Sequence, residues 1–490
     1  MNRLILSLLF FIVRTIAFGQ NCKCDSTFQI VKHHIETNYA GWFDKTKQFD
    51  KAKFLEITNE VTLNTKVISN DSLCHKEIKK YVNYFQDGHL HLNLNRPKFQ
   101  VTNNNKPIVI EKIGISETEM LTYFKSLKQL DKVEGIWENN NYKIGIIKSK
   151  ANPNIFNGII ISSKNENWMA GEVKLVAEKN KSNSYKLKFI TGDKAETIEN
   201  SIVFFKNILD AQDLILSRVF PVSNDLVSID DYTLETDPTN PKLSFPKKDI
   251  ALWTFPNLYP QNMDVVKLLL KKNKSKLETT KNWIIDLRGN EGGDVRVGNL
   301  LLPYLYTKPI VWSNEFSRLS EDNFNKWFST YIKDYYETLS KEKQQQLDSV
   351  FAVTKTHFGQ FGNWDNENKI ADTITFEKKM KTPEKVVLLI DKNTFSSGEL
   401  FTILARQSDK VIVMGEKTTG CIDYGNVMTY KTNCSSISLS LPSSRNNWLD
   451  QGISIDRDKV QPDIYIPKNI KNWVDYSYNK MKEQTKKNGR

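Results

Sequence analysis

Apolar residues recur at three- and four-residue steps through the first part of the chain. The clearest examples are STFQIVKHHIETNY (26–39), SLCHKEIKKYVNYF (72–85) and SETEMLTYFKSL (116–127). This spacing places apolar side chains along one face of a helix. We therefore predict a mainly helical region over residues 20–132.

The pattern then changes to short, strand-like runs separated by Asn, Lys, Ser and Gly. These runs cover 142–148, 158–163, 171–178 and 184–191. Such runs are typical of strands with turns between them. They predict a β-rich module over residues 133–232, whose role could be structural or substrate-binding.

Longer apolar runs follow, with helical patterns between them, at 249–255, 282–289, 385–391 and 410–416. This alternation predicts an α/β sheet with crossover helices, which we place at residues 233–470. An aromatic-rich helical insertion is expected at 321–350, either as a lid or as a packing arm. A basic tail is expected at 471–490.

Composition changes this picture little. The chain has 490 residues, of which 39% are hydrophobic and 26% are charged, values that are ordinary for a soluble protein. The net charge is +12, but Lys and Arg are scattered, whereas a nucleic-acid-binding protein concentrates its charge. We therefore expect no nucleic-acid partner.

The first 19 residues combine Arg3, an apolar run from Leu4 to Val13 and small residues near Gly19. This is typical of a secretory signal peptide. The alternative is an N-terminal membrane anchor, but the run is shorter than the ~20 residues of a span, and Arg14 interrupts it. We predict an exported chain, periplasmic, cell-surface or secreted, with no transmembrane span once residues 1–19 are removed.

Five cysteines are present, so at least one stays unpaired. Cys421 and Cys434 flank a predicted hairpin and could pair, and Cys24 could pair with Cys74. The spacings match no zinc pattern, so no metal site is expected.

Two adjacent serines, Ser396 and Ser397, follow one of the apolar runs and precede a predicted helix. Ser396 with Glu399 fits a capping box, and on pattern alone a helix cap is the simpler interpretation. The alternative places Ser396 at the carboxyl end of a strand, where α/β sheets carry their sites.

Two further segments contain residue types suited to catalysis. In DLRGNEGGD (286–294), closely spaced glycines allow backbone N–H groups to converge on an anion or oxyanion, although a tight turn is the simpler interpretation. In FQDGHLHL (85–92), His89 follows Asp-Gly at a turn and is either structural or catalytic.

Taken in order, the motifs DGH (87–89), WIIDLRGNEGGD (283–294), TFSSGELF (394–401), GEKTTG (415–420) and VQPDIYI (460–466) resemble the S41 serine peptidases. That family includes the C-terminal processing proteases, the tricorn core protease and the retinoid-binding-protein repeats. The resemblance implies an S41, ClpP/crotonase-like α/β domain that needs no cofactor.

The resemblance also implies roles for individual residues. Ser396 corresponds to the nucleophile, and the backbone N–H of Ser397 and of Gly292, or alternatively Gly293, corresponds to the oxyanion hole. The processing-protease branch takes its base from a Lys after the GExTxG motif, where this chain has Cys421. The tricorn branch instead implies His89 as general base and Asp456 as the supporting acid.

The resulting hypothesis is an exported serine endopeptidase that cleaves unstructured peptides or protein segments through an acyl-enzyme. One alternative is an inactive scaffold of the same fold that binds a ligand or peptide. Another is a carbohydrate- or lipid-directed protein in which Trp137 or Trp168 contributes to binding. Neither the cleavage specificity nor the oligomeric state follows from the sequence.

Overall fold

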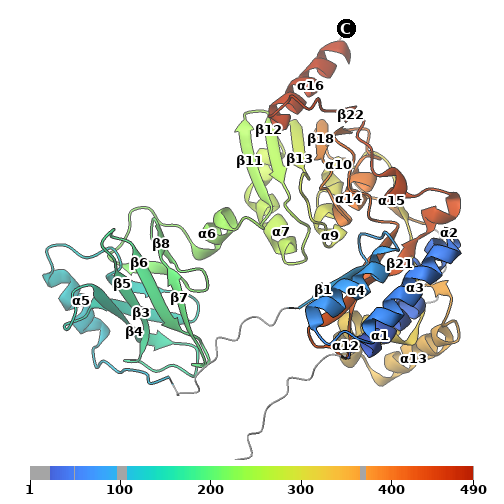
Figure 1. Ribbon diagram of the computed structural model, residues 1–490. Coiled ribbons are helices and arrows are strands. Elements are labelled where there is room, and N and C mark those ends of the chain that lie inside the picture. The colour runs from blue at the N-terminus through green and yellow to red at the C-terminus, as the bar shows by residue number, and fades with distance from the viewer. Residues whose placement is uncertain (1–22, 49, 96–107, 365–370, 489–490) are drawn as a thin grey trace, which may run out of the picture. The chain divides into compact units, whose positions relative to one another are not determined.

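The computed structural model describes residues 23–48, 50–95, 108–364 and 371–488. The chain divides into two compact units, one formed by Met1–Lys98 with Leu243–Arg490 and the other by Phe99–Lys242 (Figure 1). The first unit is discontinuous in sequence, because the second is inserted into it.

In the described part of the first unit, the first elements are four helices that pack against an antiparallel sheet. The helices are α1 (Cys24–Asn38), α2 (Trp42–Gln48), α3 (Lys51–Thr65) and α4 (Asp71–Asn83). The strands are β1 (His91–Leu94), β15 (Glu315–Arg318), β16 (Phe361–Gly362), β20 (Tyr424–Lys431) and β21 (Ile437–Asn446). Apolar side chains such as Phe28, Tyr81 and Leu439 form the core between these layers. This packing joins residues before 95 to residues after 420.

The same unit contains a second sheet, which has six strands. Its order is β11 (Lys242–Lys247), β12 (Ile250–Thr254), β13 (Asn282–Asp286), β18 (Lys385–Ile390), β19 (Val411–Gly415) and β22 (Ile464–Tyr465). The strands from β12 to β22 are parallel. Asp286 pairs with Leu389, so the loops that leave β13 and β18 start side by side at one edge of the sheet.

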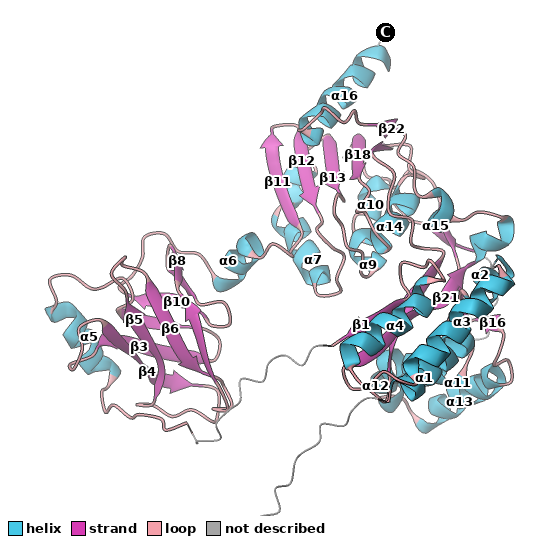
Figure 2. Cartoon of the chain, in the orientation of Figure 1, coloured by secondary structure: helices cyan, strands magenta, loops and turns pink. Residues whose placement is uncertain are grey.

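Helices and short segments complete this part of the unit (Figure 2). They are α7 (Asn262–Lys272), α8 (Lys274–Leu277), α9 (Val295–Asn299), α10 (Leu302–Leu305), α14 (Ser397–Ala405), the 3₁₀ turn η2 (Asn447–Gln451), α15 (Ile455–Asp458) and α16 (Trp473–Asn488). The last of these occupies the predicted basic tail. It is a helix because Tyr478 and Met481, three residues apart, bury one face against Val387 and Leu389 of the sheet.

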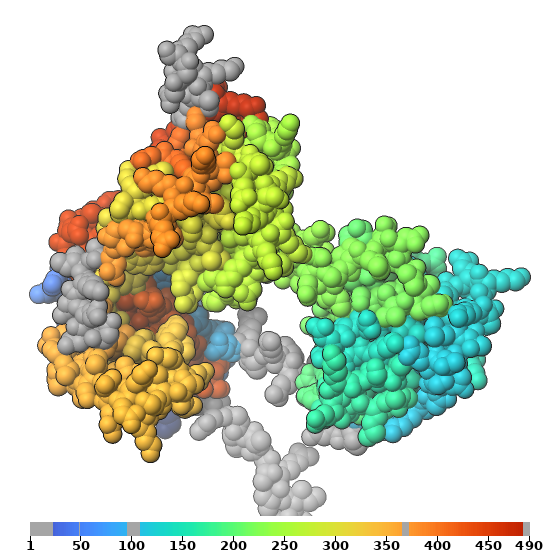
Figure 3. All heavy atoms as spheres, turned by 180° about the vertical axis from the view of Figure 1, so that it is seen from behind, coloured from blue at the N-terminus to red at the C-terminus, as the bar shows by residue number. Residues whose placement is uncertain are grey.

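The aromatic insertion folds as a helical lobe, visible in amber in the space-filling view (Figure 3). It comprises α11 (Glu321–Trp327), the π-helical turn η1 (Phe328–Ile332), α12 (Lys333–Glu337) and α13 (Lys341–Lys355). Phe324, Phe351 and Trp364 form its core. The small sheet of β14 (Ile310–Ser313) and β17 (Ala371–Ile374) flanks the insertion in the sequence.

The residues of the second unit that the structure describes form a nine-stranded antiparallel sheet and two helices. The strands are β2 (Gly135–Glu138), β3 (Tyr142–Lys148), β4 (Ile155–Ser163), β5 (Val173–Lys179), β6 (Tyr185–Ile190), β7 (Thr197–Ser201), β8 (Val203–Phe205), β9 (Ile208–Asp210) and β10 (Ile215–Phe220). The helices are α5 (Glu117–Ser126) and α6 (Ile229–Thr236). Trp137 and Trp168 are buried in its core, so neither presents a flat exposed surface to a sugar.

The predicted elements agree closely with the observed ones, and the α/β fold with an N-terminal helical region and a β-rich insertion is confirmed. The helix predicted at 116–127 is α5, which belongs to the second unit rather than to the N-terminal helices. The signal peptide predicted at 1–19 lies outside the described residues. Among the described residues, no helix is long and apolar enough to cross a membrane.

One of the two expected disulfides forms. Cys24 and Cys74 are bonded and tie α1 to α4. The pairing of Cys421 with Cys434 is wrong: Cys421 is a free, buried thiol, and Cys434 belongs to a different disulfide. Cys421 precedes β20 and Cys434 follows it, and an extended strand of eight residues spans about 26 Å, too far for a disulfide.

Candidate active site

The turn between β18 and α14 holds Ser396 in an unusual backbone conformation. Its φ is +52° and its ψ is −120°, although it is not a glycine. Such conformations cost about 1–3 kcal/mol and are enriched at active sites, ligand clamps and switch regions. The half-buried Ser396 therefore lies at a sharp strand-to-helix turn, and α/β-hydrolase enzymes use a turn of this kind to expose their nucleophile.

The Glu399 carboxylate holds this turn in place. It accepts hydrogen bonds from the N–H groups of Ser396 (3.1 Å), Gly420 (2.8 Å) and Cys421 (2.9 Å). Burial raises the pKa of Glu399, against the effect of these bonds and one from Thr418. Glu399 thus links the serine turn to the loop that carries Cys421.

The glycine loop after β13 packs directly on the serine turn. A Cβ on Gly292 would lie 2.7 Å from the Ser396 Cβ, and the φ of Gly292 is +78°. Only glycine fits such a close approach at this φ. Asn290 fastens the two loops together, because its carbonyl accepts the Phe395 N–H (2.9 Å). Its side-chain Oδ1 accepts the Gly292 N–H (2.9 Å) within the glycine loop.

His89 lies next to the serine. Its Nε2 is 3.0 Å from Ser396 Oγ, although 307 residues separate the two in sequence. The turn before β1 carries His89, and the Phe395 ring packs against the imidazole with its centroid 5.0 Å away. The structure therefore brings together the two side chains to which the motifs assign the acyl-transfer chemistry.

The other ring nitrogen of His89 faces the loop before β20. Nδ1 is 2.9 Å from the Tyr424 carbonyl oxygen and 3.3 Å from Cys421 Sγ. Because a carbonyl oxygen can only accept, Nδ1 carries the hydrogen and Nε2 is left to accept the Ser396 hydroxyl proton. This tautomer suits a general base.

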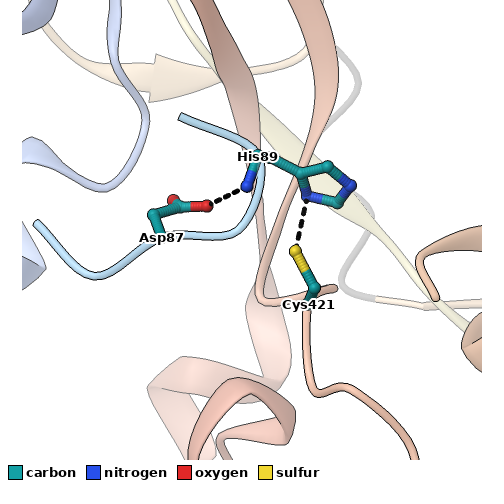
Figure 4. Close-up of side chains that lie close together, drawn as sticks. All are labelled: Asp87, His89 and Cys421. Carbon is teal, nitrogen blue, oxygen red and sulfur yellow. Dashed lines mark hydrogen bonds between the residues drawn. The ribbon is translucent and has the colours of Figure 1, made fainter. Parts of the chain in front are cut away.

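Asp87 shapes the turn rather than touching the imidazole nitrogens (Figure 4). Its Oδ1 accepts the His89 N–H at 2.8 Å, and its Oδ2 accepts the Tyr39 hydroxyl at 2.7 Å. Burial lowers the pKa of His89, and the nearby Asp87 only partly offsets this effect. The imidazole is therefore neutral, and ready to accept a proton, at neutral pH.

Asp456 supports the site from a distance. Its Oδ1 accepts the N–H groups of Ile422 and Asp423, both at 2.9 Å. No hydrogen bond joins it to His89 in the described part of the chain. Burial, followed by repulsion from Asp423 and Asp87, raises the pKa of Asp456 to about 7. Asp456 thus fixes the loop whose Tyr424 carbonyl orients the histidine.

The three backbone N–H groups expected as candidates for the oxyanion hole, those of Ser397, Gly292 and Gly293, differ in their surroundings. The Gly292 N–H is occupied by Asn290, as described above. Among the described residues, the backbone N–H groups of Gly293 and Ser397 have no hydrogen-bond acceptor, and the Ser397 hydroxyl donates to the Gly293 carbonyl (2.6 Å). Exposed Gly293 and half-buried Ser397 therefore offer two available donors beside Ser396.

Several residues of the site were not predicted as site residues from the sequence. Glu399 and Asp87 stand inside quoted motifs, and Asn290 stands inside the glycine loop, so a signal existed for all three. Tyr39 and the Tyr424 carbonyl carried none. Lys417, the lysine inside the GEKTTG motif, is exposed, and no hydrogen bond joins it to Ser396 or His89.

A family comparison agrees with this geometry. Residues 250–466 match the family model of Peptidase family S41, which covers less than half of the chain. The matched segment contains the glycine loop, Ser396, Cys421 and Asp456, while His89 lies outside it. The match supports a serine peptidase fold for this segment. No curated protein matches the sequence.

Similar solved structures include mature CPAF, with 13% identity, a TM-score of 0.45 and coverage of 91% of this chain and 93% of that one. The photosystem II D1 C-terminal processing protease aligns with 10% identity and a TM-score of 0.37, covering 92% and 94%. The tricorn protease aligns with 10% identity and a TM-score of 0.39, covering 94% of this chain and 37% of that one.

Proposed function

We propose that this protein is a serine endopeptidase that cleaves unstructured peptides or protein segments through an acyl-enzyme. The observation that carries the proposal is the 3.0 Å contact between His89 Nε2 and Ser396 Oγ at a strained turn. His89 takes the Ser396 proton as the hydroxyl oxygen attacks the peptide carbonyl, then returns it to the leaving amine. Water, activated by the same imidazole, hydrolyses the acyl-enzyme.

The oxyanion of the tetrahedral intermediate is stabilised by backbone N–H groups. Of the three candidates, Ser397 and Gly293 have no acceptor for their N–H within the part of the chain that the structure describes, so this pair fits the role better than Ser397 with Gly292. Stabilisation of this kind needs preorganised donors near 3 Å from the developing charge. The hydrogen bond from the Ser397 hydroxyl to the Gly293 carbonyl holds the two donors in a fixed relation.

The supporting groups differ from a Ser-His-Asp triad. Where such a triad places a carboxylate on the second histidine nitrogen, here a backbone carbonyl, that of Tyr424, accepts from Nδ1. A neutral acceptor fixes the tautomer but stabilises the imidazolium less than a carboxylate does. The proposal therefore includes a base that is well oriented and only weakly assisted.

A serine-reactive fluorophosphonate tests the proposal without knowledge of the substrate. The wild-type chain should be labelled at Ser396, as located by peptide mass mapping, and Ser396→Ala should remove the label and the cleavage of an unfolded protein such as casein. Ser397→Ala is the matched control: it loses only the hydroxyl bond to Gly293 and should be labelled more slowly. Absence of labelling in the folded wild-type chain would favour the inactive binding scaffold.

We also propose that the protein is exported, to a periplasm, the cell surface or the medium. The Cys24–Cys74 disulfide supports this, because such bonds persist in oxidising compartments. Expression of the full sequence in a secreting host, followed by fractionation and N-terminal mass analysis, should give a chain that begins near residue 20. An uncleaved chain retained in the cytoplasm would contradict the proposal.

A further inference from the structure

Three side chains of types that commonly bind metals, one of them the proposed base His89, lie close together on the Nδ1 side of its imidazole ring. Asp87, His89 and Cys421 are all buried, and each offers one ligand atom, with these atoms all within 4.8 Å of one another. Figure 4 shows Asp87 and Cys421 on the Nδ1 side of the imidazole, while the other ring nitrogen points away from them. The cluster therefore does not occupy the position of the serine.

The chain is built to hold the sulfur in this place. A Cβ on Gly88 would lie 2.5 Å from Cys421 Sγ, so the glycine between Asp87 and His89 makes the room. Glu399 holds the Cys421 N–H (2.9 Å), and the Tyr39 hydroxyl holds Asp87 (2.7 Å). The His89 N–H donates to Asp87 (2.8 Å), so each of the three ligands comes from a segment fixed by a hydrogen bond.

The separation between the sulfur and the imidazole nitrogen suits a tetrahedral cation. Zinc binds histidine nitrogen at about 2.0–2.1 Å and thiolate sulfur at about 2.3 Å, so two such ligands lie about 3.3–3.7 Å apart. Cys421 Sγ and His89 Nδ1 are 3.3 Å apart. The Tyr424 carbonyl oxygen, 2.9 Å from Nδ1, or a water would supply a fourth donor.

We infer that Asp87, His89 and Cys421 form an inhibitory site for a zinc-like divalent cation, which switches off the proposed peptidase. The mixed thiolate, imidazole and carboxylate set favours zinc or cadmium over calcium or magnesium, which prefer oxygen ligands. This inference concerns regulation of the site and rests, for its inhibitory part, on the proposed function.

Inhibition follows from the histidine tautomer. When the cation binds, Cys421 releases its thiol proton to solvent, and the imidazole hydrogen moves from Nδ1 to Nε2, so one proton leaves in all. Nε2 then carries a hydrogen and can no longer accept the proton of Ser396. The serine remains in place but has no base.

Binding is tested independently of activity in a Ser396→Ala chain titrated with cadmium. A cadmium–thiolate charge-transfer absorption should rise to one equivalent and then stop. A second substitution in this chain, Cys421→Ala, should remove the charge-transfer band, and Asp87→Asn should weaken cadmium binding. The control is His91→Ala as the second substitution. It replaces an exposed histidine two positions after His89 and should leave the band unchanged. Near-ultraviolet circular dichroism verifies that each variant is folded.

Inhibition is tested in the wild-type chain. One equivalent of zinc should suppress fluorophosphonate labelling of Ser396 at least tenfold, and a chelator should restore it. A band that survives Cys421→Ala, or no band in any folded chain, would overturn the site. A Cys421-dependent band with unchanged labelling would overturn the inhibition. If metal-free wild type is not labelled at all, the proposed function fails, while the cadmium titration still decides the site.

Discussion

The two halves of the candidate site are built in contrasting ways. The nucleophile half comes from two loops, 287–294 and 391–397, that leave neighbouring parallel strands at the same edge of one sheet. The base half comes from segments far apart in the chain: the turn at Asp87–His89, Tyr39 of the first helical region and the loop from Cys421 to Tyr424. Strand pairing determines the first half, whereas tertiary packing assembles the second.

This contrast predicts where substitutions act. In the nucleophile half, strain and close packing are concentrated in a few backbone positions, so small steric changes have large effects. In the base half, most partners act through hydrogen bonds to the backbone, so conservative replacements that keep an acceptor should be tolerated. Both halves meet at Glu399, which accepts N–H groups from Ser396 and from Cys421.

The largest expected effect in the base half is that of His89→Ala. Removal of a general base costs about 10²- to 10⁴-fold, and the fluorophosphonate labelling rate should fall by that range. His91→Ala is the matched control and should stay near the wild-type rate. A His89→Ala chain that is labelled at the wild-type rate would mean that another group accepts the Ser396 proton.

In the nucleophile half, Gly292→Ala should reduce the labelling rate about fivefold to 150-fold. The added methyl would lie 2.7 Å from Ser396 Cβ and would require a φ of +78°. Strain of about 1–3 kcal/mol corresponds to this range of rates if it displaces Ser396. Gly289→Ala separates the two causes, because Gly289 has a φ of +69° but no atom within 4 Å of the added Cβ. Equal losses in both variants would show that φ strain, and not the contact, is responsible.

The same contrast explains what the sequence could predict. The strands at 282–286 and 385–390, and the serine between strand and helix, leave local patterns, because each depends on neighbouring residues. Tyr39 and the Tyr424 carbonyl leave none, since a backbone carbonyl has no sequence identity and Tyr39 meets Asp87 only after the fold forms. The incorrect pairing of Cys421 with Cys434 has the same origin: closeness in sequence does not reveal that an extended strand separates them.

Asp456 offers a finer test of the base half. Asp456→Ala leaves the buried N–H groups of Ile422 and Asp423 without their acceptor, which costs about 1–3 kcal/mol for each. The urea midpoint of the unit that contains Asp456 and the labelling rate should both fall. Asp456→Asn keeps an acceptor oxygen and should restore both. An Asn variant as inactive as the Ala variant would assign Asp456 a role that requires its charge.

The smallest expected effect is on the pH dependence of labelling. Burial lowers the pKa of His89 below its ordinary value of 6.5, so the imidazole is still mainly neutral at that pH. The labelling rate should change less than about twofold between pH 7.5 and 6.5 and should fall only further into acid, as His89 becomes protonated. Asp456, with its pKa raised to about 7, gains its proton within the same interval. Asp456→Asn cannot titrate, so an acid limb that persists unchanged in this variant belongs to His89. A limb that disappears would instead show that protonation of the supporting loop, and not of the base, limits the reaction.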